Sequence, residues 1–182
     1  MDIVVAGSHG LIGTELLERL RADGHHVRRL VRRAPQTSDE HEWDPDSGRL
    51  DPGVLAGADA VVNLAGAGIG DHRWTTAYKR TLVTSRTRTT GLLARTIAGL
   101  DSPPPVWLQG SAIGYYGDRG SQVLTETSAS GDGFLARLVR EWEAATAPAE
   151  QAGVRVVHAR TGIVLSPDGG ALGRLLPRRR RG

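Results

Sequence analysis

The chain contains no cysteine and a single lysine, Lys79, among its 182 residues. Without cysteine, the sequence cannot form a disulfide framework, a thiolate zinc site, an iron–sulfur cluster or a cysteine nucleophile. It also lacks any run of about 18 apolar residues that could cross a membrane. Charges and glycines interrupt residues 1–25, where a cleavable apolar leader would lie. We therefore expect a cytoplasmic protein with no membrane partner.

The positive charge is concentrated at one end of the chain. All 23 basic residues except Lys79 are arginines, and four of them occupy positions 178–181. Without this run the formal net charge of +3 becomes −1, so the remaining chain is nearly neutral. An arginine run can bind nucleic acid or an acidic membrane surface. Because no aromatic residue lies among these arginines to stack on a base, we interpret the run as a solvated chain end and predict no specific nucleic-acid partner.

The order of apolar segments predicts alternating strands and helices. Strands are expected at residues 2–6, 26–31, 59–64 and 154–159, with a short one near Trp43 and a helical turn near residues 54–55. A further strand is expected to start at residues 106–108 and to end in the segment 110–117. Helices are expected at residues 10–23, 74–100 and 135–145, and Pro148 should kink or end the last of them. This alternation is typical of an α/β fold with a doubly wound parallel sheet. The ligand site of such a sheet lies beyond the carboxyl ends of its strands, where the winding direction reverses.

Three glycines, Gly7, Gly10 and Gly13, follow the first strand and open the first helix. The first glycine permits a tight turn, the second lets the backbone approach a diphosphate, and the third lets the helix pack close to the strand. The N-terminus of the helix then offers free N–H groups and a positive dipole end to the phosphates. We predict a dinucleotide-binding turn made of Gly7, Ser8, Gly10, Leu11, Ile12 and Gly13. The alternative is a purely structural turn.

The second strand ends in Arg32 and Arg33 rather than in an acidic residue. An acid at this position would bind the ribose 2′-hydroxyl of NAD, whereas guanidinium groups suit a 2′-phosphate. The pattern therefore predicts NADP(H) in preference to NAD(H). Two solvated arginines at a strand end remain the alternative interpretation.

Small residues end the predicted strand at 59–64. Leu64, Ala65 and Gly66 leave room for the backbone to pack against ribose and nicotinamide, so we count them as cofactor-binding. The strand that starts at 106–108 leads into Ser111, Tyr115 and Tyr116. These residues place a hydroxyl and two phenols at the carboxyl-terminal edge of the sheet, where the reaction is expected to take place. We predict that Ser111 contacts the cofactor. The alternative for the two tyrosines is half-buried packing with polar tips.

Together these segments resemble a known family. The sequences GSHGLIG at residues 7–13, SAIGYYGD at 111–118 and RTGIVLSPDGG at 160–170 occur in this order, and the resemblance covers nearly the whole chain. They are similar to an atypical branch of the extended short-chain dehydrogenase/reductase superfamily, the NAD-dependent epimerase/dehydratase-like "epimerase family proteins". The resemblance implies a Rossmann fold, NADP(H) binding, and oxidoreductase or sugar-nucleotide epimerase ancestry.

One departure from the superfamily concerns catalysis. Extended members carry a Tyr-x-x-x-Lys pair, in which the lysine lowers the pKa of the tyrosine and holds the nicotinamide ribose. Here the only lysine is Lys79, and the residue four positions before it is Thr75. Loss of the tyrosine as the general acid alone lowers the reaction rate about 10²–10⁴-fold. Ser111 with Tyr116, or with Tyr115, is the predicted substitute as the catalytic hydroxyl pair.

A second departure concerns length, because the resemblance implies about 300 residues. We therefore expect a truncated chain, with an NAD(P)-binding Rossmann domain at residues 1–166, an arginine-rich tail at 167–182, and most of the substrate-binding C-terminal part missing. Such a chain would expose a sheet edge, which predicts a homodimer or poor solubility.

Two functions from different classes remain open. The first is an NADP(H)-dependent oxidoreductase or epimerase-type enzyme acting on an unknown small molecule. The second is a catalytically silent dinucleotide-binding protein, or a non-functional fragment of such an enzyme. The six histidines show no ligand spacing, so no metal site is predicted.

Overall fold

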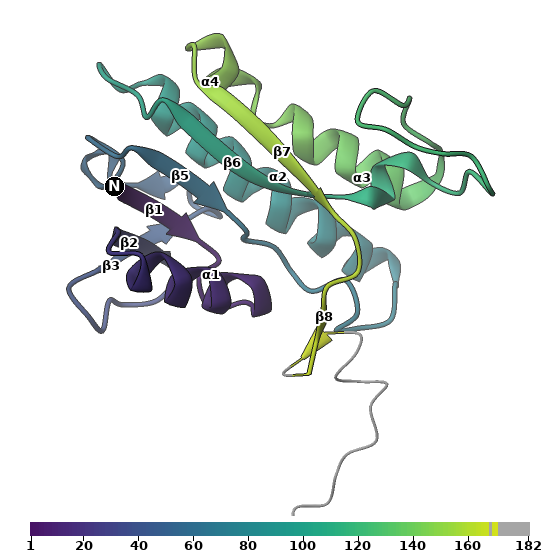
Figure 1. Cartoon of the computed structure of the whole chain (residues 1–182), viewed down its shortest axis with the longest axis horizontal. Helices are drawn as coiled ribbons and strands as arrows, with labels where there is room; N and C mark the ends of the chain where they lie inside the picture. The colour runs from purple at the N-terminus through teal and green to yellow at the C-terminus, as the bar shows by residue number, and fades with distance from the viewer. Residues whose placement is uncertain (168, 171–182) are drawn as a thin grey trace, which may run out of the picture.

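A computed structural model of the chain describes residues 1–167, 169 and 170 (Figure 1). The arginine run predicted at positions 178–181, and most of the tail predicted at 167–182, lie outside the described residues. Within the described part, seven strands form one sheet in the order β4-β3-β2-β1-β5-β6-β7. The strands are β1 (Asp2–Ala6), β2 (His26–Val31), β3 (Glu40–Asp44), β4 (Arg49–Leu50), β5 (Ala60–Asn63), β6 (Val106–Ala112) and β7 (Arg155–Thr161). A short strand, β8 (Leu165–Ser166), follows β7 outside this sheet.

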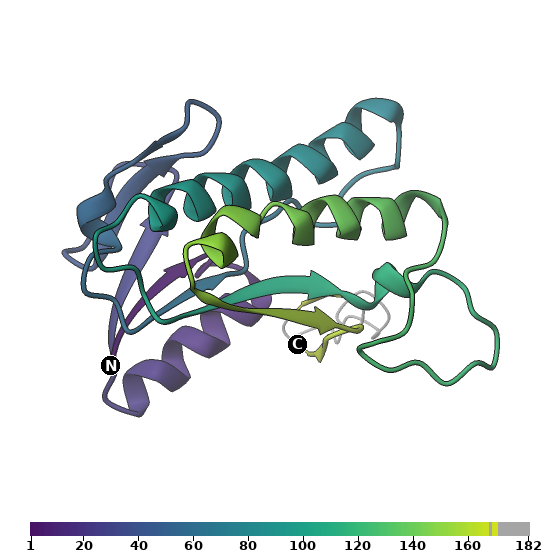
Figure 2. The ribbon, with the colours of Figure 1, turned by 90° about the horizontal axis from the view of Figure 1, so that it is seen from above.

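Helices cover both faces of the sheet, which confirms the predicted doubly wound α/β fold. In Figure 2, α1 (Leu11–Ala22) lies on one face, while α2 (Thr76–Ala98), α3 (Gly133–Ala144) and α4 (Ala147–Gln151) lie on the other. Two short 3₁₀ helices, η1 (Pro52–Val54) and η2 (Ile113–Tyr116), complete the set. Pro148 lies at the start of α4, beyond the end of α3, so it separates two helices as expected.

The winding direction reverses between β2 and β5, which lie on either side of β1. Ala6, the last residue of β1, pairs with Leu30 on one side and with Asn63 on the other, and both pairings are parallel. The carboxyl ends of these three strands therefore meet at one edge of the sheet. Within the sheet, β4 departs from the predicted parallel arrangement, because it pairs antiparallel with β3.

Strand β6 starts at Val106, as predicted, and continues to Ala112. Gln109, Gly110 and Ser111 carry no apolar side chain, and yet all three are buried. The buried amide of Gln109 is satisfied by Asn63 on the neighbouring strand, whose Nδ2 donates to its Oε1 over 2.9 Å. Its Nε2 donates to the carbonyl oxygen of Gly110 over 2.8 Å, so both polar atoms of this buried side chain have partners.

The core consists of apolar layers on the two faces of the sheet. Val4, Val61 and Trp107 pack with Leu93 and Ile97 of α2, and each of these side chains is fully buried. The opposite layer joins Ile3 and Val5 to Leu17 of α1. Because alternate residues of β1 face the two layers, this central strand is buried on both sides, as its continuous apolar sequence predicted.

Strands β4 and β7 form the two edges of the sheet. On β6 and β7, Leu108 is 37% exposed and Val157 is 39% exposed, so this part of the sheet presents apolar side chains to solvent. Homodimerisation through an exposed edge stays a prediction. Among the described residues, no helix combines the length and the apolar character needed to span a bilayer.

A buried carboxylate joins β2 to β3. The side chain of Glu40 is only 2% exposed, and the Arg33 guanidinium donates to both of its oxygens over 2.7 Å. Arg29 adds a third contact, with Nη1 lying 3.1 Å from Oε1. The hydrogen bonds from Arg33 are the largest cause that lowers the pKa of Glu40 from 4.5 to about 2. The carboxylate is therefore ionised wherever the protein is folded near neutral pH.

This pair predicts a specific acid sensitivity. Because folding lowers the pKa of Glu40, its contribution to the free energy of unfolding is present above pH 4.5 and is lost as the pH falls towards about 2. We expect Glu40→Gln to lower stability at neutral pH and to flatten the dependence of stability on pH across this window. Glu42→Gln is the matched control, since Glu42 forms only a surface pair with Arg49. Urea unfolding at a series of pH values gives the slope of the free energy of unfolding against pH. Equal slopes for the wild type and Glu40→Gln would contradict this account.

Candidate functional site

A cleft of about 500 Å³ lies at the edge where the carboxyl ends of β1, β2 and β5 meet. Six of the predicted cofactor-binding residues line it: Gly7, Gly10, Arg32, Leu64, Ala65 and Gly66. Thr81, Ser85 and Thr89, which α2 places one turn apart, form the opposite wall. Leu11 and Ile12 line an adjoining groove that shares His9 and Gly10 with the cleft. The remaining predicted residues, Ser8, Gly13, Arg33 and Ser111, do not line the cleft.

The three glycines of the turn have different steric environments. Gly7 has φ +83°, and a Cβ there would lie 2.6 Å from the carbonyl carbon of Leu64. A Cβ on Gly13 would lie 2.1 Å from the carbonyl oxygen of Gly7. A Cβ on Gly10, in contrast, would meet only that same oxygen at 3.5 Å. Gly7 and Gly13 therefore permit close packing of the turn, while Gly10 faces open space in the cleft.

The first turn of α1 has no side-chain cap. Gly10 is its N-cap residue and has no side chain to accept hydrogen bonds, and the turn contains no acidic residue. The first N–H groups of a helix have no partner within the helix, and the aligned peptide dipoles place partial positive charge there. This end of α1 is therefore free to bind an anion, and its geometry fits the diphosphate of a dinucleotide.

Arg32 and Arg33 occupy different environments although they are neighbours in the sequence. Arg33 binds Glu40 and also donates to the carbonyl oxygen of Ala34 over 3.0 Å. Arg32 is exposed, and no described residue forms an ion pair or hydrogen bond with it. Of the two guanidinium groups, only that of Arg32 is thus available to a ligand.

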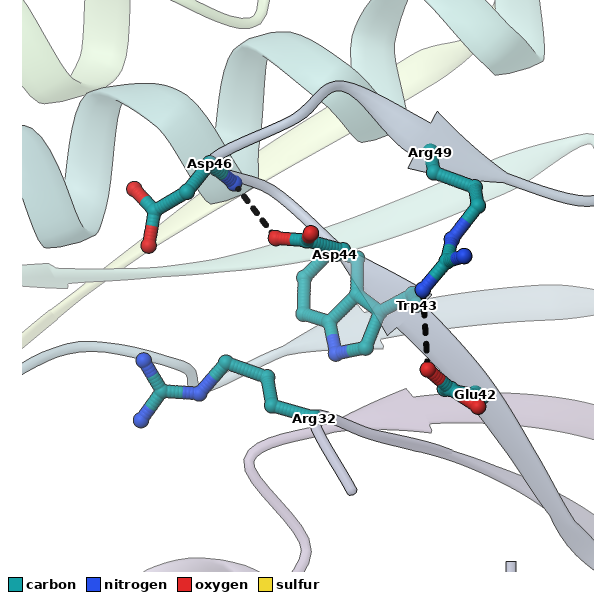
Figure 3. Close-up of a pocket in the computed structure, with 6 residues that line it drawn as sticks. All are labelled: Arg32, Glu42, Trp43, Asp44, Asp46 and Arg49. Atoms are coloured by element: carbon teal, nitrogen blue, oxygen red, sulfur yellow. Dashed lines mark hydrogen bonds and ion pairs between the residues drawn. The ribbon is translucent and has the colours of Figure 1, made fainter. Parts of the chain in front are cut away.

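Figure 3 shows Arg32 beside a second hollow of about 470 Å³ that adjoins the cleft at Trp43. Three carboxylates line this hollow, and each has a partner of its own. Glu42 accepts from Arg49 over 2.9 Å, Asp44 accepts from the backbone N–H of Asp46 over 3.0 Å, and Asp46 pairs with Arg88 over 2.5 Å. The carboxylates are therefore satisfied without Arg32.

A buried network of polar side chains holds the loop that follows β5. Asn63 donates from Nδ2 to Gln109, and its Oδ1 accepts from the backbone N–H of Ala65 over 3.1 Å. Thr90 of α2 contacts both amides, and Trp142 of α3 donates from Nε1 to the Thr90 hydroxyl over 3.0 Å. This network fixes the backbone at Ala65 and Gly66, which line the cleft. Sequence reasoning missed it because its members are far apart in the chain.

The predicted catalytic hydroxyls belong to a second buried network. Ser111 is 3% exposed and donates to Oε1 of Glu143 over 2.5 Å. Arg160 donates to both oxygens of Glu143 over 2.9 Å, and its Nη1 donates to the phenol oxygen of Tyr116 over 2.9 Å. The same guanidinium lies 3.5 Å from the ring centroid of Tyr115. Both tyrosines therefore pack against Arg160.

This arrangement changes the interpretation of two residues. Ser111 and Tyr116 do not bond to each other, because Glu143 and Arg160 lie between them. Glu143 of α3 is the acceptor for the Ser111 hydroxyl. Burial by itself raises the pKa of Glu143, but hydrogen bonds from Arg160 and Ser111 outweigh it, so the pKa lies below its ordinary value. Arg160 begins the segment RTGIVLSPDGG, but neither that segment nor the residues around Glu143 identify the two side chains as partners.

The doubly wound sheet, the glycine turn and the cleft at the reversal of winding define a Rossmann-type dinucleotide-binding protein. Comparison with protein-family models matches residues 3–181 to the NAD dependent epimerase/dehydratase family. The chain belongs to this family, as the sequence resemblance predicted.

Individual relatives agree with this assignment. An epimerase family protein of Mycobacterium bovis is 49% identical over 175 residues, which cover 96% of this chain and 58% of that protein. A Corynebacterium glutamicum structure described as a nucleoside-diphosphate sugar epimerase has a TM-score of 0.84 at 40% identity, covering 96% of this chain and 36% of its own. The human epimerase family protein SDR39U1 (isoform 2), solved with NADPH, has a TM-score of 0.83 at 35% identity, covering 96% of this chain and 58% of its own. The chain thus spans little more than half the length of its curated relatives.

The steric difference between the glycines predicts different stabilities for two alanine variants. Gly10 has φ −78° and ψ 168°, which alanine adopts readily, so Gly10→Ala should keep the unfolding free energy within about 1 kcal/mol of the wild type. Gly13→Ala should lose about 2 kcal/mol or more, because its Cβ would overlap the Gly7 carbonyl and push α1 away from the turn. Urea unfolding of both variants checks this, and equal losses would show that the turn is not packed as described.

Proposed function

We propose that the chain binds NADP(H) in the cleft at the carboxyl ends of β1, β2 and β5, and that it serves as the cofactor-binding part of an oxidoreductase or epimerase-type enzyme. The observation that carries the proposal is the uncapped N-terminus of α1 beside Gly10. The N–H groups of Leu11 and Ile12 would hold the diphosphate there, as backbone amides do in other Rossmann proteins. When bound, the cofactor would supply or accept a hydride.

The preference for the phosphorylated cofactor rests on Arg32. Its guanidinium lines the cleft at the end of β2, where the ribose of the adenosine half is expected, and it has no partner among the described residues. A guanidinium binds a phosphate through two charge-assisted hydrogen bonds, which a 2′-hydroxyl cannot replace. The NADPH found with human SDR39U1 supports the same choice.

The two neighbouring arginines provide a matched test of this preference. We expect the wild type to bind NADPH more tightly than NADH, and Arg32→Gln to weaken NADPH binding by about tenfold or more while NADH binding changes little. Arg33→Gln should retain the preference, because Arg33 is engaged with Glu40. Isothermal titration calorimetry of the three proteins with both cofactors measures the six affinities. A wild type that prefers NADH, or equal effects of the two substitutions, would overturn the assignment to Arg32.

For catalysis we propose that Ser111 relays a proton between the substrate oxygen and the Glu143 carboxylate. When a substrate alcohol is oxidised, its hydroxyl proton would pass through Ser111 to Glu143 while the hydride goes to the cofactor. When a carbonyl is reduced, the same path would return a proton from Glu143 through Ser111 to the substrate oxygen. Ser111 lies at the end of β6 and already donates to Glu143, whose orientation is set by the paired guanidinium of Arg160. Tyr116 would orient Arg160 through its phenol oxygen. This arrangement differs from the Tyr-x-x-x-Lys pair, since α3 carries a carboxylate and no lysine.

A catalytically silent cofactor-binding protein is the second candidate. The observation in its favour is that Ser111 is nearly inaccessible and that both of the predicted hydroxyls are engaged by protein groups. The longer relatives include a protein described as a nucleoside-diphosphate sugar epimerase, which makes sugar nucleotides the first class to assay.

The two candidates differ in turnover rather than in binding. If the chain is an oxidoreductase, the wild type should oxidise NADPH in the presence of at least one member of a panel of carbonyl compounds. If it is an epimerase, it should interconvert at least one pair of epimeric sugar nucleotides with no net oxidation of NADPH. Ser111→Ala should then reduce the rate of the observed reaction by about 10²-fold or more, because it removes the proton-transferring group while NADPH affinity is retained. Tight NADPH binding by the wild type with neither reaction across the panel would select the silent protein. Absorbance at the reduced nicotinamide band follows the oxidation, and chromatography of the sugar nucleotides follows the epimerisation.

A further inference from the structure

Arg86 of α2 is a half-buried cation that the preceding proposals leave unexplained. No carboxylate of the described residues forms an ion pair with it, whereas Arg29, Arg33, Arg88 and Arg160 all bind acidic side chains. Of the five N–H donors of its guanidinium, one is used, in a hydrogen bond from Nη1 to the Leu82 carbonyl oxygen over 3.0 Å. Burial holds the pKa of Arg86 below its ordinary value. A desolvated and unpaired charge is costly, so its retention calls for a partner.

The surroundings of this guanidinium locate it beside the cleft. A Cβ on Gly66 would lie 3.2 Å from Cγ and 3.3 Å from Cζ of Arg86, so the side chain packs directly against the backbone of a cleft-lining glycine. On its other side, Cζ lies 5.0 Å from the ring centroid of Trp142. The buried hydrogen bond from Trp142 to Thr90 holds the indole in place. The aromatic ring and the glycine backbone thus fix the position of the Arg86 guanidinium, but neither neutralises its charge.

The topology of the sheet assigns this charge to one half of the cleft. Arg32 lies at the end of β2, and Gly66 follows β5 on the other side of β1. A dinucleotide whose adenosine half is at Arg32 and whose diphosphate is at the start of α1 would extend its nicotinamide half towards Gly66. Arg86 therefore lies beside the nicotinamide half and the substrate that would meet it.

We propose that Arg86 is an oxyanion-binding residue at the β5 end of the cleft, where it takes phosphate or carboxylate oxygens of the bound cofactor or of its substrate. This inference rests on the proposed function, because it uses the cofactor's direction in the cleft. Trp142 and Gly66 position the guanidinium. The N–H groups of this planar group that have no protein partner can donate to two oxygens of one anion. The absence of an internal carboxylate keeps the charge available to a ligand.

Binding measurements with two nucleotides test the cofactor as the source of the oxygens. The probes are NADPH and 2′,5′-ADP, which keeps the adenosine half and lacks the nicotinamide half. Arg86→Met should weaken NADPH binding about tenfold and leave 2′,5′-ADP binding unchanged, whereas Arg86→Lys should retain part of the NADPH affinity because it keeps the charge. Arg88→Met is the control, since Arg88 is exposed, lies on the same helix and pairs with Asp46 at the surface. It should leave both affinities unchanged.

A substrate oxyanion would give a different pattern in the same variants. NADPH affinity would then be unaltered by Arg86→Met, while inorganic pyrophosphate would bind to the NADPH-saturated wild type and not to the NADPH-saturated variant. If Arg86→Met changes neither NADPH nor pyrophosphate binding, the inference is overturned. If the wild type does not bind NADPH, the proposed function itself fails, which is a separate result.

Thermal unfolding without ligand distinguishes ligand binding from a structural role. Because Arg86 is desolvated and unpaired, Arg86→Met should unfold at the same temperature as the wild type or at a higher one. If Arg86 instead stabilised the packing of α2 against α3, Arg86→Met would have a lower unfolding temperature and unchanged ligand affinities. That combination would also overturn the inference.

Discussion

The site depends on the close contact between the start of α1 and the turn that leaves β1. Gly13 lies so near the Gly7 carbonyl that a Cβ would be 2.1 Å from its oxygen, and Gly7 itself needs φ +83° to make the turn. This contact places the N-terminus of the helix directly at the carboxyl end of the central strand. Gly10, between the two, faces open space, so the backbone amides that follow it remain accessible. If the helix lay farther from the strand, the cleft would lose its anion-binding wall.

Polar networks inside the protein fix the rest of the cleft. The amides of Asn63 and Gln109 hold the loop at Ala65 and Gly66, and the Glu143–Arg160 pair holds the end of β6 against β7 and α3. In contrast, the guanidinium groups of Arg32 and Arg86 have no carboxylate partner among the described residues. These two cations lie beside one cleft, and the proposed anionic ligand rests on this arrangement.

Sequence reasoning predicted the fold and the glycine turn because both are local. Apolar runs identify β1, β2 and β5. Three glycines between a strand and a helix indicate a tight turn that brings the helix close to the strand. It did not predict the antiparallel strand β4 or the network around Ser111, since Glu143 is 32 residues away from Ser111 and Arg160 lies on another strand. Nor could it separate Arg32 from Arg33, which differ only because Glu40 of β3 binds one of them. Contacts between distant segments decide these features, and no local pattern encodes them.

The most direct measurement of the central claim is a crystal structure of the chain with NADPH. The account predicts diphosphate density within hydrogen-bond distance of the backbone nitrogens of Leu11 and Ile12, with the 2′-phosphate against Arg32. Cofactor density elsewhere on the protein, or amides at this turn that bind protein groups instead of phosphate, would contradict it.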